Sequence, residues 1–248
     1  MKALLPLDIA PQPDEITCGP TCLQAIYSFY DDPISLDQTI AEVPMLEGGG
    51  TLAVLLANHA LRRGYRATIF TYKLQLFDPT WVDLPAAALA DKLRLQAACK
   101  KDPKLLTATD AYLQFLELGG QLRAKDLNGA LLRGFLSQGV PIITGLSATF
   151  LYRSAREYGS NCDYDDVRGE PSGHFVVLYG YDREARTVHV ADPLKSNPMT
   201  GTQNYTASID RVINAILLGV LTYDANLLII QPAKEKKVNA STDPDRRR

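Results

Sequence analysis

The spacing of apolar residues predicts an amphipathic helix over residues 18–29, where apolar side chains recur at intervals of three and four. The entry to this helix reads Thr-Cys-Gly-Pro. Proline suits a first helical turn because its missing N–H has no partner there in any case. We therefore expect Cys18 at a helix N-terminus.

Capping residues predict further helices along the chain. Ser35 opens a capping box for a short helix to about residue 43, and Thr51 is expected to cap a helix that ends at Gly64. Three more helices, each starting at a proline or an aspartate, are expected at about residues 85–101, 103–118 and 126–137. A further helix is expected before the last strand, at about residues 209–218.

Alternating β-branched and aromatic residues predict strands, most of them in the last third of the chain, at residues 66–72, 140–146, 174–181, 187–192 and 227–231. Helices followed by an antiparallel sheet define an α+β fold. Residues 1–233 are expected to form a single domain with a helical elaboration at about 84–137. Residues 234–248 are polar, charged and without aromatics, which is typical of a disordered tail.

The composition and net charge argue against nucleic acid and membranes as binding partners. The chain has 248 residues, of which 46% are hydrophobic, and 26 basic residues nearly balance 28 acidic ones. The net charge of −2 supplies no basic field for nucleic acid or an anionic membrane. No apolar run approaches the ~18 residues of a membrane-spanning helix, and Pro6 and Asp8 interrupt any secretory signal. We expect a cytoplasmic protein with reduced thiols; the sequence does not indicate an oligomeric state.

Cys18 is the candidate nucleophile, because a helix N-terminus beside an imidazolium favours the reactive thiolate. Cys22 lies one turn further into the helix, and core packing is its expected role. Among the histidines, His59 lies within an apolar helical stretch and is expected to be structural. Two histidines, His174 and His189, compete for the role of base.

The geometry of a hairpin favours His174 as the base. If the strands around residue 184 pair as a hairpin, opposed positions have numbers that sum to about 368, and His174 and Asp192 sum to 366. The two side chains then lie nearly opposite each other. His189 and Asp192 are three residues apart on one strand and point to opposite faces. Asp192-Pro193 alone would ordinarily be interpreted as a plain strand end. Only its combination with Gln12, Cys18 and His174 argues for a catalytic site.

Three stretches together carry a resemblance: QPDEITCGPTCL at 12–23, GHFVVLYGYD at 173–182 and VHVADP at 188–193. They resemble the papain-like cysteine peptidases of the C39 type, the double-glycine leader peptidases and their stand-alone relatives. The resemblance implies a papain-like fold in which Cys18 is the nucleophile, His174 the base and Asp192 its orienting partner. It also implies that Gln12 contributes to the oxyanion hole, and that no cofactor is used.

The resemblance implies hydrolysis of a peptide or amide bond through an acyl-enzyme, with a peptide as substrate. Small-residue motifs such as Gly-Gly are the family's cleavage sites, although this chain lacks the nucleotide-binding motif of transporter-linked members. Two alternatives stay open: transpeptidation or γ-peptide amide hydrolysis of the phytochelatin-synthase type, and a catalytically silent peptide-binding module. The cysteine spacing does not fit a zinc site, so no metal is expected.

The long segment 147–173 runs into the proposed base and is expected to border the substrate cleft. The candidate substrate-binding residues are Tyr152 and Tyr158 in this segment, with Gly19 and Gly173 beside the reactive groups. The helical stretch 84–137 could act as a lid or recognition surface, and ordinary scaffold is at least as good an interpretation.

Overall fold

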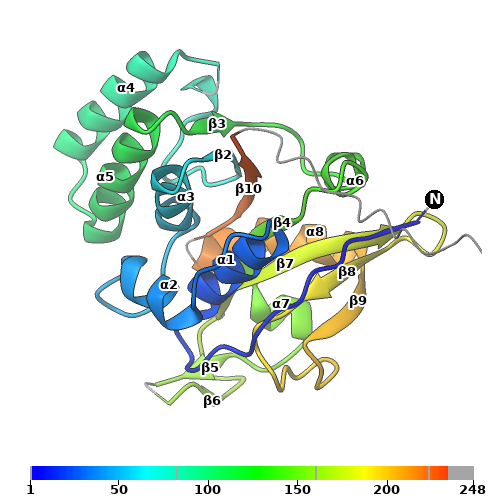
Figure 1. Ribbon diagram of the computed structural model, residues 1–248. Coiled ribbons are helices and arrows are strands. Elements are labelled where there is room, and N and C mark those ends of the chain that lie inside the picture. Colours follow the sequence, from blue (N-terminus) through cyan, green and yellow to red (C-terminus); the bar gives the residue numbers. More distant parts are fainter. Residues whose placement is uncertain (1, 82, 160, 223, 234–248) are drawn as a thin grey trace, which may run out of the picture.

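A large, mainly antiparallel sheet forms the centre of the computed structural model, which describes residues 2–81, 83–159, 161–222 and 224–233 (Figure 1). Its strand order is β3-β2-β10-β4-β7-β8-β9, and β1 pairs with the far end of β7. Neighbouring strands are antiparallel except for the parallel pair of β2 and β3. The strands span Lys2–Leu4 (β1), Tyr65–Thr71 (β2), Gln121–Arg123 (β3), Ile142–Ser147 (β4), Gly173–Asp182 (β7), Thr187–Ala191 (β8), Asn204–Ser208 (β9) and Asn226–Pro232 (β10).

Helices cover both faces of this sheet and confirm the α+β class. The helices span Cys18–Phe29 (α1), Leu36–Glu42 (α2), Ala53–Arg62 (α3), Ala86–Cys99 (α4), Pro103–Glu117 (α5), Gly129–Leu136 (α6), Ala148–Tyr152 (α7) and Ile209–Leu218 (α8). Short 3₁₀ turns occupy Pro79–Trp81 and Gly219–Thr222. No helix within the described residues is long and apolar enough to span a membrane.

Two hydrophobic cores lie on opposite faces of the sheet. Val176 and Val177 are neighbours on β7, yet each belongs to a different core, because successive side chains of a strand point to opposite faces. One core packs the sheet against α1, α3 and α5, and the other against α6, α7 and α8. Figure 1 shows α1 in front of the middle of the sheet and α8 behind it.

A long-range contact replaces one of the two caps expected from the sequence. Ser35 caps α2 as expected, since its hydroxyl accepts from the Gln38 N–H. The expectation for Thr51 is wrong, because its hydroxyl donates to a backbone carbonyl at Pro44. The first N–H of α3, at Ala53, donates instead to the carboxylate of Asp224 at 2.6 Å.

Several other elements differ from the sequence-based expectation. Helix α6 starts at Gly129 rather than 126, because the Asn128 side chain accepts from the first N–H groups of the helix. The segment 147–173 is not an open loop: it contains α7 and a small hairpin of β5 (Glu157–Tyr158) and β6 (Asp163–Tyr164). Strands β1, β3 and β9 were missed, and two of these have only three residues. The expected tail at 234–248 lies outside the described residues.

Close packing at Gly19, which follows Cys18, generates a stability prediction. A Cβ at Gly19 would lie 2.5 Å from Thr51 Cγ2, inside a buried contact between α1 and the start of α3. Overpacking of this kind costs about 1–3 kcal/mol. We expect Gly19→Ala to lower the free energy of unfolding by that amount in urea titrations.

Gly134→Ala is the matched control, because this glycine lies inside α6 with open space around it. Alanine there is expected to leave stability unchanged or to raise it by up to about 1 kcal/mol. Equal stability of the two variants would contradict the packing role of Gly19.

Candidate active site

Cys18 is the first residue of α1 and lines a cavity beside the sheet. The side chain is buried, with 8% of its surface exposed. No acidic residue lies in the first turn of α1, so no carboxylate of the helix offsets the partial positive charge of its N-terminus. Cys22 follows one turn later, and its thiol donates to the Phe175 carbonyl at 3.3 Å. The two thiols therefore differ, since Cys18 faces the cavity and Cys22 packs inside.

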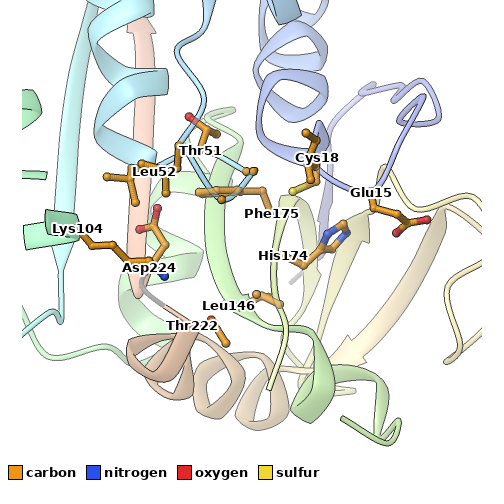
Figure 2. A pocket seen from close by; sticks show the side chains of 16 residues that line it. Glu15, Cys18, Thr51, Leu52, Lys104, Leu146, His174, Phe175, Thr222 and Asp224 are labelled. Atoms are coloured by element: carbon orange, nitrogen blue, oxygen red, sulfur yellow. The ribbon is translucent and has the colours of Figure 1, made fainter. Parts of the chain in front are cut away.

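His174 stands near the start of β7 and faces Cys18, as Figure 2 shows. Its Nε2 lies 2.8 Å from Asp192 Oδ1, which leaves Nδ1 for the thiol. Burial by itself lowers the pKa of His174. The charge and hydrogen bond of Asp192 outweigh this effect and, together with Cys18, raise the pKa to about 10. The imidazolium is thus the favoured form at neutral pH.

The strand register explains how His174 and Asp192 meet. Val177 pairs with Ala191 on β8, so that paired numbers sum to 368 up to a bulge after Leu178. Continuation of this register beyond Ala191 places Asp192 diagonal to His174, two positions from direct opposition. Both side chains then point to the same face. The structure brings the two residues together, as the hairpin arithmetic predicts.

Asp192 is fully buried and accepts four hydrogen bonds. Oδ1 accepts from His174 and from the Leu194 N–H, and Oδ2 accepts from the hydroxyls of Tyr152 and Tyr205. Burial alone would raise the pKa of Asp192, but the His174 charge and these hydrogen bonds hold it below its usual value. Each oxygen of the buried carboxylate thus accepts two hydrogen bonds, which offset the free-energy cost of burying its charge.

Gln12 lies near Asp192 without lining the cavity. Its backbone N–H donates to the Pro193 carbonyl at 2.9 Å, which ties the N-terminal segment to the residue after Asp192. Its side-chain amide donates to the Asp14 carbonyl at 2.8 Å. The amide has a second hydrogen, so a role in the oxyanion hole stays a prediction.

The four expected substrate-binding residues lie in different surroundings. Gly173 lines the cavity, whereas Gly19 packs against Thr51. Tyr152 differs from expectation, because it is buried behind Asp192 and does not line the cavity. Tyr158 is 45% exposed on the β5–β6 hairpin, where the Arg168 guanidinium lies over its ring at 4.4 Å.

The other histidines have their own partners. His59 bridges the Tyr27 hydroxyl and the Glu42 carboxylate at 2.8 and 2.9 Å, as a structural histidine does. His189 lies opposite Gly180, with its ring 5.8 Å from that of Tyr179. Among the described residues no group of three or more His, Cys, Asp and Glu side chains is placed to hold a metal ion.

The cavity beside Cys18 and His174 has a volume of about 260 Å³. Asp224 lies at the end away from His174 (Figure 2). Burial raises the pKa of Asp224 to about 6, although the Ala53 N–H and nearby Lys73 act in the opposite direction. The remaining lining includes the glycines 48–50 and Glu15, Ile16, Leu46, Thr51, Leu52, Lys104, Leu146, Gly173, Phe175 and Thr222.

Sequence reasoning missed Tyr205, Lys104 and Asp224. Tyr205 lies at a buried position of β9, where buried and exposed residues alternate. This alternation is the sequence signal from which the strand could be predicted. Lys104 enters from α5, so the helical elaboration contributes one residue to the cavity wall. Asp224 is joined to the start of α3 by a contact across 171 residues, for which the sequence carries no local signal.

Comparison with known protein families gives one match. Residues 101–214 match the model of the Peptidase_C39 like family, a range that contains His174 and Asp192 but not Cys18. The match confirms the resemblance carried by the sequence motifs. Over this range, which is just under half of the chain, the sequence is similar to the C39-like peptidases. No curated protein sequence matches the chain.

Several solved structures are similar at low sequence identity. A C39-like peptidase from Bacillus anthracis is 14% identical, with 93% of this chain and 97% of that chain covered and a TM-score of 0.47. Xylellain, a cysteine protease from Xylella fastidiosa, is 16% identical, with 94% and 86% covered and a TM-score of 0.46. A double-glycine-motif protease from an AMS/PCAT transporter, solved with its leader peptide, is 13% identical, with 93% and 94% covered and a TM-score of 0.46.

The raised pKa of His174 generates a prediction about stability and pH. Folding raises this pKa from 6.5 to about 10. The stabilisation is therefore fully present below about pH 6.5 and is lost as pH rises through 10. We expect the stability advantage of the native chain over His174→Gln, measured by urea unfolding, to be largest at pH 6 and smallest at pH 10.

His189→Gln is the control for this series, because His189 contacts neither Asp192 nor Cys18 in any interaction described above. This variant keeps the contact between His174 and Asp192, so its difference from the native chain is not expected to follow the loss between pH 6 and pH 10 that is expected for His174→Gln. An advantage over His174→Gln that is constant or grows with pH would show that the imidazolium is not the stabilised form.

Proposed function

We propose that the chain hydrolyses a peptide bond through Cys18, His174 and Asp192. The observation that carries the proposal is the 2.8 Å contact between His174 Nε2 and Asp192, with Cys18 and His174 facing the same cavity. A nucleophile, a base and a group that orients the base are the parts that covalent catalysis of acyl transfer requires.

The first half of the reaction follows from these positions. The proton of Cys18 resides on His174 Nδ1, and the thiolate attacks the carbonyl carbon of the scissile bond. The tetrahedral oxyanion lies near the Cys18 N–H at the start of α1, and the second amide hydrogen of Gln12 is its other proposed donor. One such donor contributes about 3–4 kcal/mol in related sites. His174 then protonates the leaving amine, and a thioester remains on Cys18.

Water completes the cycle. His174, now neutral, takes a proton from water as the oxygen attacks the thioester carbon, and the second product leaves as a carboxylic acid while Cys18 regains its thiolate. Throughout these steps Asp192 keeps its charge and holds the ring in place. Its complete burial and its four donors fit that constant role.

The cavity favours a substrate with small residues at the reacting bond. Its volume of about 260 Å³ lies below the ~300–1,000 Å³ of pockets that enclose a whole small molecule. Four glycines, three of them in the loop 48–50, form part of its wall. We infer that a short, narrow part of a peptide enters and that the rest of the substrate lies outside. The small-residue cleavage motifs suggested by the C39 resemblance are consistent with this shape.

Peptide cleavage tests the proposal. Peptides of ten to fifteen residues with a central Gly-Gly or Gly-Ala are incubated with the full chain, and products are identified by mass spectrometry. We expect cleavage after the small residues and a transient acyl adduct on Cys18. Cys18→Ala is expected to lower the rate more than about 10³-fold.

Cys99→Ala and His189→Ala are the matched controls, because both residues lie outside the cavity lining. Each is expected to retain most of the activity. Undiminished cleavage by Cys18→Ala, or equal losses in His174→Ala and His189→Ala, would contradict the assignment. Transfer of the acyl group to an added amine in preference to water would indicate transpeptidation instead.

A further inference from the structure

Two tyrosines that do not line the cavity converge on one oxygen of Asp192. Tyr152, the last residue of α7, donates its hydroxyl to Oδ2 at 2.7 Å, and Tyr205 of β9 donates to the same atom at 2.8 Å. Both side chains are buried, with 8% of their surface exposed. The chain thus brings residues from two separate elements to a carboxylate that already has a catalytic partner.

The two oxygens of Asp192 have separate partners. Oδ1 accepts from His174 and the Leu194 N–H, while Oδ2 accepts only the two phenols among the described residues. Asp192 has no exposed surface, so water cannot replace a missing donor without a change in the structure. The phenols are therefore the groups on which the charge at Oδ2 depends.

The position of one proton depends on these donors. A buried imidazole and carboxyl can exist as an imidazolium with a carboxylate or as two neutral groups, and burial favours the neutral pair because charged groups are costly to desolvate. Hydrogen bonds from hydroxyls to Oδ2 stabilise the carboxylate and so favour the charged pair. An imidazolium at His174 adds to the helix N-terminus in stabilising a thiolate at Cys18, whereas a neutral ring does not.

We propose that Tyr152 and Tyr205 are positioning residues that keep the shared proton on His174 rather than on Asp192, and thereby keep Cys18 reactive below neutral pH. This inference rests on the proposed function and deepens it. The titratable groups that face the pair are Cys18 and Cys22 of α1, together with the two tyrosines. Glu15 lies at the cavity lining on the Cys18 side.

Alkylation of Cys18 in the full chain measures this state without a peptide substrate. The rate with iodoacetamide is followed by peptide mass spectrometry at pH 6 and pH 9 in the native chain, Tyr152→Phe, Tyr205→Phe and the double variant. An isolated thiol ionises near pH 8.5, so it reacts at pH 9 but slowly at pH 6. We expect the ratio of the pH 6 rate to the pH 9 rate to fall at least about tenfold in the double variant and about threefold in each single variant.

Tyr27→Phe is the matched control, because it also removes a buried phenol hydroxyl, one that contacts His59 rather than Asp192. It is expected to leave the ratio unchanged even where it lowers stability. A folded double variant with the native ratio would overturn the proposal. If the double variant does not fold, native ratios in both single variants would overturn it equally.

The test separates this inference from the proposed function. If the alkylation ratio falls in the tyrosine variants but no peptide is cleaved, the positioning role stands and the proposed substrate is wrong. If peptides are cleaved but the ratio does not change, the triad stands and the tyrosines only pack against it.

Discussion

The hydrogen bond between His174 Nε2 and Asp192 Oδ1 joins β7 to the residue after β8 and has neighbours from both hydrophobic cores. Cys18 belongs to the core that contains α1, whereas Tyr152 and Tyr205 belong to the core on the other face of the sheet. The histidine and the aspartate connect these groups across the end of β7. Packing on both faces of the sheet therefore holds Cys18, His174 and Asp192 in their mutual arrangement.

The cost of burying charge explains the surroundings of this contact. An isolated carboxylate in a dry interior is strongly unfavourable, and removal of one partner from a buried pair is more damaging than absence of the pair. Asp192 is surrounded by donors from α7, β7, β9 and the backbone at Leu194. Because each donor comes from a different part of the chain, the charge state of the site depends on the tertiary structure and not on a local motif.

The sequence predicts the parts of this arrangement that local signals determine. Helices α1 and α8 have the predicted bounds, since periodicity and end residues are local, and hairpin arithmetic pairs His174 with Asp192 because the connecting turn is short. The cap of α3 by Asp224 and the contact of Tyr205 with Asp192 depend on distant segments. Tyr152 was expected in the cleft because its segment reads as a loop, whereas α7 turns it toward Asp192.

The protonation state of His174 tests the central claim most directly. Nitrogen-15 NMR of the imidazole ring, with the signals assigned through His174→Gln, distinguishes an imidazolium from a neutral ring. At pH 8, where a histidine with an unperturbed pKa of about 6.5 is neutral, the account predicts that both ring nitrogens of His174 carry protons. A neutral His174 at that pH would contradict the account, because the carboxylate and its four donors would then not hold the proton on the ring.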